Sequence, residues 1–190
     1  VRCASSLTEH APRRGADSRP PSPAGAPGVL GRILSLDDFE EPARRYLPRP
    51  IYGYVASGAE REASRHLNRK AYDDLAFIPR APVDTSTRRQ STTLFGADYD
   101  SPFGMAPMGG TSLGVYRADL ALARAAAGAN IPMILSGGAF ATLEAVRAAG
   151  RTTWFQAYLP GDDAIIARII ERAARAGYET LCVTVDVSVG

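Results

Sequence analysis

Neutral polar side chains and one carboxylate recur along the second half of the chain, each after an apolar stretch. They are Ser136 in LSGG, Gln156 and Tyr158 in FQAY, and Thr184 and Asp186 in TVD. Hydroxyl and amide groups donate and accept hydrogen bonds without adding net charge. Such a set suits a ring with several heteroatoms better than a metal ion, so no metal site is expected. Singly, each residue could equally be a helix cap or a satisfied polar group of the core.

A regular alternation of strand-like and helix-like stretches must position these residues. Strands are predicted at 102–109, 131–138, 152–160 and 180–188, and helices at 117–130, 141–150 and 162–178. Connections this short predict parallel βα units, whose active sites lie at the carboxyl ends of the strands. Each unit spans about 25 residues, close to the repeat of a (β/α)8 barrel. The pattern predicts an α/β fold, either half of such a barrel or an open sheet.

The chain before residue 102 has a different character. Residues 1–33 are rich in Pro, Ala, Arg and Ser and lack an apolar period, which predicts a disordered or non-native tail. Short helices are predicted from Ser35 to about Tyr46, near 50–58 and near 60–71, followed by two extended segments within 91–109. Residues 34–190 are therefore expected to form N-terminal helices and the first half of a barrel.

Composition and missing motifs exclude several functions. A net charge of +2 over 190 residues gives no reason to expect nucleic acid as a partner. The sequence has no GxGxxG or P-loop motif. His10 and His66 lie outside the strand ends, so neither is placed to act as a general base there. Cys3 and Cys182 lie at opposite ends of the chain and indicate neither a disulfide framework nor a zinc site.

Five motifs together resemble one known family. They are IYGYVASGAERE, FGMAPMG, IPMILS, WFQAYL and VTVDV, in that order. Over about residues 35–190 the chain is similar to the FMN-dependent α-hydroxy-acid dehydrogenases and oxidases, which include glycolate oxidase, lactate dehydrogenase and mandelate dehydrogenase. The resemblance implies a (β/α)8 TIM barrel with N-terminal helices, of which this chain would hold about the first four βα units.

The resemblance also implies a role for each candidate site residue. The expected flavin contacts are the backbone of Ala106, Pro107 and Met108, the side chains of Ser136 and Gln156 at the isoalloxazine edge, and Thr184 on the pyrimidine side. Two tyrosines are the expected catalytic residues: Tyr158 between flavin and substrate, and Tyr54, whose hydroxyl would meet the substrate carboxylate. Asp186 would support the flavin-binding Thr184 by orienting neighbouring groups.

The implied reaction is the FMN-dependent oxidation of an (S)-2-hydroxy acid to a 2-oxo acid. The family's catalytic His, Arg pair and Lys lie on or after the fourth strand, and the flavin phosphate site on the last strands. None of these groups is found in this sequence, so the 190 residues alone are expected to be inactive. Two other hypotheses stay open: another FMN barrel such as type 2 isopentenyl-diphosphate isomerase, and a non-catalytic half-barrel.

One departure from the family pattern concerns the substrate. Gly138 stands where glycolate-oxidase-like members place a bulky aromatic residue. The smaller residue predicts room for an aryl or long-chain 2-hydroxy acid, unless Phe140 fills the space. The remaining expectations are a small 2-hydroxy acid as substrate, an unknown electron acceptor, no nucleic acid, a homo-tetrameric parent protein, and a cytoplasmic location with peripheral attachment to the inner membrane left open.

Overall fold

The computed structural model describes residues 31, 33–159 and 161–185. Contacts divide the chain into Val1–Leu34 and Ser35–Gly190, and every helix and strand given below lies in the second unit. The tail predicted over 1–33 falls almost wholly outside the described residues and stays a prediction. Within the described residues no helix is both long and apolar enough to cross a membrane.

Short helices follow Ser35, as predicted. The elements are a 3-10 turn η2 (Leu36–Phe39) and the helices α1 (Glu40–Tyr46), α2 (Arg49–Ala56) and α3 (Ala63–Lys70). The backbone N–H of Ser35 donates to Asp38 Oδ2 at 2.8 Å, so a side chain satisfies one of the free donors of the first turn. The predicted third helix begins three residues late because Glu60 and Glu62 have left-handed backbone conformations.

The two extended segments predicted within 91–109 form a hairpin of β1 (Thr92–Leu94) and β2 (Ala97–Tyr99). Phe95 and Gly96 turn the chain with φ of 50° and 80°, the conformation that a tight two-residue hairpin turn requires. Trp154 contacts both the turn of this hairpin and the end of its second strand. Its Nε1 donates a hydrogen bond to Tyr99 Oη at 3.0 Å, and its ring packs edge-to-face against the ring of Phe95.

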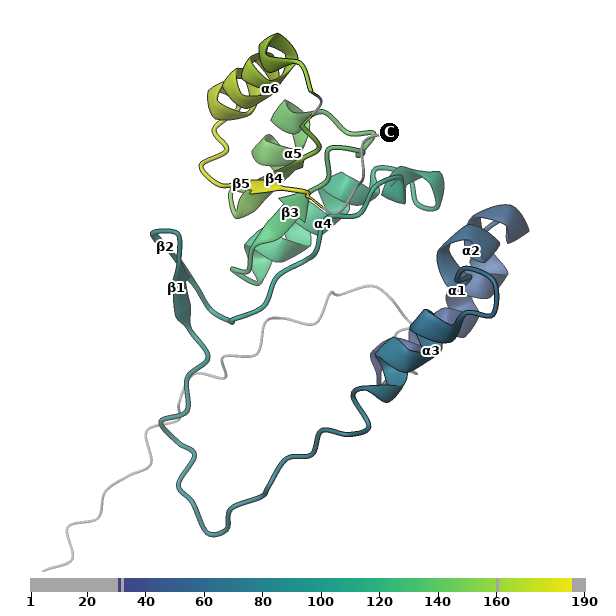
Figure 1. The fold of residues 1–190 in the computed structure, drawn as a ribbon. Coiled ribbons are helices and arrows are strands. Elements are labelled where there is room, and N and C mark those ends of the chain that lie inside the picture. Colours follow the sequence, from purple (N-terminus) through teal and green to yellow (C-terminus); the bar gives the residue numbers. More distant parts are fainter. Residues whose placement is uncertain (1–30, 32, 160, 186–190) are drawn as a thin grey trace, which may run out of the picture. The chain divides into compact units, whose positions relative to one another are not determined.

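The central sheet is parallel and follows chain order. It contains β3 (Met133–Leu135), β4 (Thr153–Ala157) and β5 (Leu181–Val183) (Figure 1). The strand predicted over 102–109 is wrong as a full strand: it forms a single parallel bridge between Met105 and Met133. Pro102, Pro107 and Pro132 lack the N–H that a continuous ladder would use. The four predicted segments nevertheless lie in the predicted spatial order.

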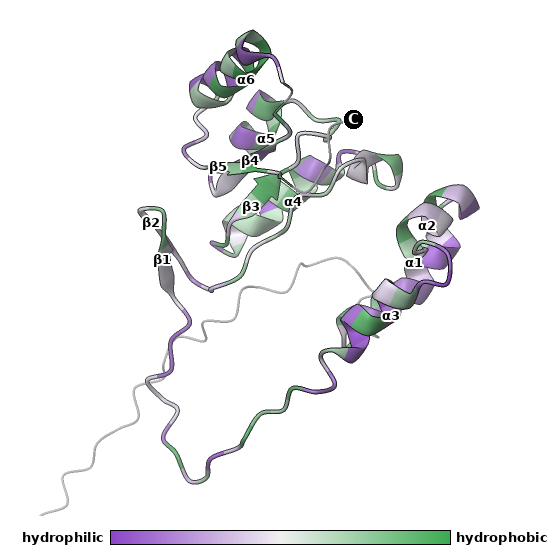
Figure 2. Cartoon of the chain, viewed as in Figure 1, coloured by the Kyte–Doolittle hydropathy of each residue, from purple (hydrophilic) through white to green (hydrophobic). Residues whose placement is uncertain are grey.

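Three helices alternate with these strands: α4 (Ala118–Gly128), α5 (Leu143–Ala149) and α6 (Asp163–Arg175). Capping side chains set two of their starts, since Thr142 Oγ1 accepts from Ala145 N and Asp162 Oδ1 accepts from Ala164 N. The core lies between the sheet and these helices, and Figure 2 shows that β3 is hydrophobic whereas α6 mixes hydrophobic and hydrophilic residues. The described strands form a partial α/β layer that does not close on itself.

Packing between α4 and α5 depends on one glycine. A Cβ on Gly150 would lie 2.2 Å from the carbonyl oxygen of Ala123, well inside the contact limit. The backbone after α5 therefore approaches α4 at a distance that only glycine allows. This close approach packs the end of α5 against α4.

Candidate functional site

Gln156 is the centre of a hydrogen-bonded cluster at the carboxyl ends of β3, β4 and β5. Its Oε1 accepts from Ser136 Oγ at 3.2 Å and from Gly137 N at 3.0 Å. Its Nε2 donates to Thr184 Oγ1 at 2.6 Å. Gln156 is 3% exposed, so these bonds replace those it would make to water. Three of the predicted cofactor-binding residues are thus brought together.

Among the described residues the cluster leaves two hydrogens without an acceptor, the second hydrogen of Gln156 Nε2 and the hydroxyl hydrogen of Thr184. Ser136 Oγ donates to Gln156 and accepts from Gly138 N at 3.1 Å, so both of its functions are used. Thr184 Oγ1 accepts from Gln156, and within the described residues nothing receives the hydrogen of its hydroxyl. A hydroxyl can donate one hydrogen bond while it accepts another. Thr184 therefore remains a neutral donor for a ligand at this edge.

The segment after Met105 lies beside the cluster. Gly110 N donates to the carbonyl oxygen of Gly138 at 3.2 Å, which joins the loop after the first strand segment to the loop after β3. Ala106, Met108 and Ser136 line the same narrow cavity. Ala106, Pro107 and Met108 are all exposed, so their backbone is open to a ligand. Their predicted flavin contacts remain predictions.

Tyr158 follows β4 and is 50% exposed. A Cβ added to Gly137 would lie 3.5 Å from the Tyr158 ring, so the ring stands next to the loop after β3. The tyrosine is thus at the same strand ends as Gln156, with its hydroxyl free to meet a second ligand. This placement agrees with the predicted position but does not test the predicted role.

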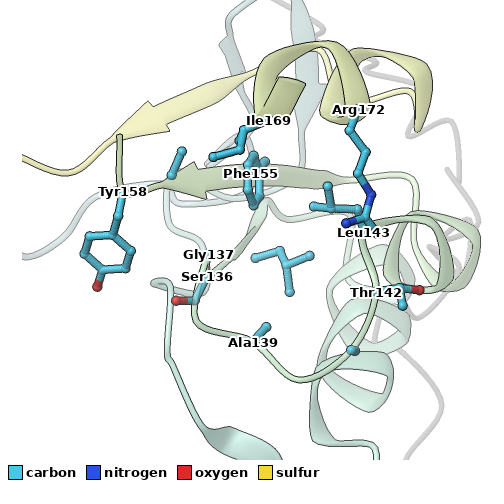
Figure 3. Close-up of a pocket in the computed structure, with 12 residues that line it drawn as sticks. Ser136, Gly137, Ala139, Thr142, Leu143, Phe155, Tyr158, Ile169 and Arg172 are labelled. Carbon is cyan, nitrogen blue, oxygen red and sulfur yellow. The ribbon is translucent and has the colours of Figure 1, made fainter. Parts of the chain in front are cut away.

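A pocket of about 340 Å³ lies mainly on the other face of the sheet, although Ser136 and Tyr158 also line it. Leu135 and Phe155 line it, and they alternate with Ser136 and Gln156, so they point to the opposite side. Figure 3 shows Tyr158 and Arg172 at opposite sides of this pocket.

Arg172 is not free to bind an anion in that pocket. Its Nε and Nη2 donate to the two carboxylate oxygens of Glu144 at 2.9 and 3.0 Å. This fork lowers the pKa of Glu144 from 4.5 to about 2. The pocket therefore offers a mixed polar and apolar lining and an ion pair that is already complete.

Within the described residues, the predicted Tyr54 is not joined to the cluster. Tyr54 lies on α2 and is 82% exposed, so its hydroxyl is accessible, but its relation to the strand ends stays a prediction. Asp186 lies outside the described residues.

Burial raises the pKa of the Cys182 thiol, which keeps the thiol protonated and agrees with a packing role for this residue.

Sequence reasoning missed Asp119. This residue sits in the first turn of α4, is 1% exposed, and accepts from Thr111 Oγ1 at 2.7 Å. It lines the same narrow cavity as Ala106, Met108 and Ser136. The sequence offers one signal for this contact, since Thr111 and Ser112 precede Asp119 by eight and seven residues. An acid in the first turn of a helix is common for electrostatic reasons alone, so this signal does not distinguish the two explanations.

Comparisons with known proteins agree with this geometry. The model of the family described as FMN-dependent dehydrogenase matches residues 43–190. L-lactate dehydrogenase of Caulobacter vibrioides is 38% identical over 158 residues, which are 83% of this chain and 41% of that protein. Glycolate oxidase of Spinacia oleracea is 33% identical over 155 residues, which are 81% of this chain and 42% of that protein.

Solved structures give the same answer for the fold. A mandelate oxidase structure aligns with a TM-score of 0.77 at 34% identity, over 82% of this chain and 47% of that chain. A structure of an active mutant of (S)-mandelate dehydrogenase aligns with a TM-score of 0.77 at 32% identity. The predicted fold class, about the first four βα units of a TIM barrel, is confirmed.

The chain spans less than half the length of the relatives it matches. The family match nevertheless covers every strand of the central sheet and every residue of the Gln156 cluster. The chain therefore belongs to the FMN-dependent dehydrogenase family, and the predicted cofactor, FMN, is that of its family.

Proposed function

We propose that this chain forms the part of an FMN-dependent 2-hydroxy-acid oxidoreductase that holds the edge of the flavin ring. The observation that carries the proposal is the Gln156 cluster, which presents neutral polar groups where three parallel strands end. A flavin ring edge has several donors and acceptors, and strong charges beside it would change its redox potential. The donor set therefore fits the ring.

In the proposed reaction an (S)-2-hydroxy acid loses its α-hydrogen and its hydroxyl proton and becomes a 2-oxo acid. FMN, when bound, accepts the two electrons. Gln156 holds Ser136 and Thr184 in fixed orientations, and Thr184 donates its free hydrogen to the ring edge. Tyr54 carries a phenol group that donates a hydrogen bond to the substrate carboxylate without adding charge, and Tyr158 stands between the flavin and the substrate.

The substrate side chain is proposed to be aryl or otherwise larger than that of glycolate. A Cβ on Gly138 would lie 3.7 Å from Gly109 Cα and from Ser136 Oγ, an ordinary van der Waals distance, so glycine leaves free a volume that a side chain could occupy. Phe140, the residue that could fill it, is 65% exposed. Relatives named mandelate oxidase, one solved with benzoyl-formic acid, support the same class. The family match does not favour the isopentenyl-diphosphate isomerase alternative.

Three further points rest on the resemblance alone. We propose that the 190 residues by themselves do not turn over, because the sequence lacks a His or Lys at a strand end. The working enzyme is proposed to be a homo-tetramer. Its location is proposed to be cytoplasmic, with peripheral attachment to the inner membrane left open.

Binding and turnover test this proposal separately. FMN is titrated into the purified chain, and quenching of flavin fluorescence reports binding. Lactate, glycolate and mandelate are then added, and loss of the flavin absorption band reports reduction. Saturable quenching without reduction is the expected result. Absence of any saturable quenching would refute the proposed flavin site, and reduction by any of the three acids would refute the proposed inactivity.

A further inference from the structure

Asp119 is a buried carboxylate that the proposed function does not use. It accepts hydrogen bonds from Thr111 Oγ1 at 2.7 Å and from Ser112 Oγ at 3.4 Å. Among the described residues, no Lys, Arg or His forms an ion pair with it. Two hydroxyl donors and the first turn of α4 are thus its main compensation for lost hydration. Burying a carboxylate without a cation beside it costs free energy, which suggests that its hydrogen bonds have a role.

The bonds of Asp119 fasten one particular segment. Thr111 and Ser112 belong to the 3-10 turn η3 (Thr111–Leu113), which follows the exposed residues 106–109 and the half-buried Gly110. That backbone is also attached at Gly110, whose N–H donates to the loop after β3. The segment is therefore held at two points, one on the loop after β3 and one on Asp119.

The cavity lining connects Asp119 to the candidate flavin site. Ala106, Met108 and Ser136 line one narrow cavity together with Asp119 and Thr111. Asp119 itself is too deeply buried to touch a cofactor. Any effect it has on the site must pass through the segment that it anchors.

We propose that Asp119 is a positioning residue, which holds the segment 106–113 through Thr111 and Ser112 so that its backbone is presented to the flavin ring. This inference rests on the proposed function, because it takes the ring to lie against 106–108. The anchoring itself is a property of this chain alone and can be measured without cofactor.

The test weakens the bond from the Asp119 side and removes it from the Thr111 side. Asp119→Asn removes the charge, Thr111→Val removes the donor while leaving the carboxylate, and Thr111→Ser restores the donor. The matched control is Asp98→Asn, since Asp98 Oδ1 accepts from Thr93 Oγ1 at 2.6 Å in the exposed hairpin. Amide hydrogen exchange across 106–113 is measured without FMN, and FMN affinity is measured by fluorescence quenching.

We expect Asp119→Asn and Thr111→Val to speed exchange across 106–113 and to weaken FMN binding about tenfold, the effect of one charge-assisted hydrogen bond. Thr111→Ser and Asp98→Asn should keep wild-type values for both. If Asp119→Asn does not fold, the two Thr111 variants decide the question. A merely structural role would lower thermal stability without the selective change in exchange.

Three results would overturn the proposal. The first is unchanged exchange and affinity in Thr111→Val. The second is an equal change in Asp98→Asn. The third is faster exchange with no loss of FMN affinity, which would show anchoring without positioning. If the wild-type chain binds no FMN, the proposed function fails and the flavin part of this inference fails with it, while the exchange data still decide whether Asp119 anchors the segment.

Discussion

Replacing Gln156 tests the centre of the candidate site most directly. Gln156→Met keeps a similar volume but removes the acceptor of Ser136 Oγ and Gly137 N and the donor to Thr184. Each buried group left without a partner costs about 1–3 kcal/mol. Because Ser136 can rotate toward another acceptor and the Gly137 amide cannot, we expect a loss of roughly 2–4 kcal/mol in the free energy of unfolding.

Gln156→Glu separates stability from ligand binding. A carboxylate still accepts from Ser136 and Gly137 but cannot donate to Thr184. Thr184 must then turn its hydrogen toward the new carboxylate, and the second amide hydrogen of Gln156 is gone, so both donors available to the flavin are lost. We expect most of the stability to remain and FMN affinity to fall by at least tenfold, since a negative charge is also placed beside the ring edge.

Urea denaturation and FMN titration measure the two effects, and exposed Gln90→Met is the matched control. The reasoning would be refuted if Gln156→Met stayed within about 0.5 kcal/mol of the wild type, the usual range for a surface substitution. It would also be refuted if Gln156→Glu bound FMN as tightly as the wild-type chain does.

Three further predictions concern packing, pH and the ligand. Gly150→Ala should lower the free energy of unfolding, measured by urea denaturation, by roughly 1–3 kcal/mol, because its Cβ would lie 2.2 Å from the Ala123 oxygen. Gly161→Ala is the control and should change this free energy little, because a Cβ there would meet nothing within 4 Å. Arg172 lowers the pKa of Glu144 to about 2, so their ion pair stabilises the fold above about pH 4.5 and loses this effect as pH falls toward 2. Glu144→Gln should therefore make the stability of the chain depend less on pH between about 4.5 and 2. An unchanged pH dependence of stability in this range would contradict the assignment. Lumiflavin, which lacks the ribityl phosphate, should bind the chain with an affinity within about threefold of that of FMN, because the described strand ends carry no Lys or Arg to hold a phosphate. A much higher affinity for FMN would contradict a site that binds the ring alone.

Apolar periodicity was sufficient to predict most of the fold. The strands near Met133, Phe155 and Leu181 and the helices between them lie where their patterns predict, because burial of one helical face or a whole strand dictates residue type locally. The first strand was predicted too long, because its ladder depends on hydrogen bonds to a neighbour that includes Pro132. Backbone donors of a partner strand are not visible in the periodicity of the strand itself.

The candidate site could likewise be predicted only in part from the sequence. Ser136, Gln156 and Thr184 could be predicted as a group, since parallel strands end at one edge of a sheet. The direction of the Gln156 amide, and with it the free hydrogen on Thr184, follows only from which neighbours surround it. Asp119 could not be distinguished from an ordinary acid in the first turn of a helix, because its burial comes from the loop folded over it.

The sequence by itself determined the order of strands and helices, the neutral character of the residues at the strand ends, and the family. These depend on residue type and on spacing along the chain, which a linear pattern contains. Only the tertiary structure decided which polar groups are paired, which face of the sheet carries the large pocket, and which carboxylate is buried. Those properties arise from contacts such as Thr111 to Asp119 and Trp154 to Tyr99, where the partner is chosen by the packing of separate elements.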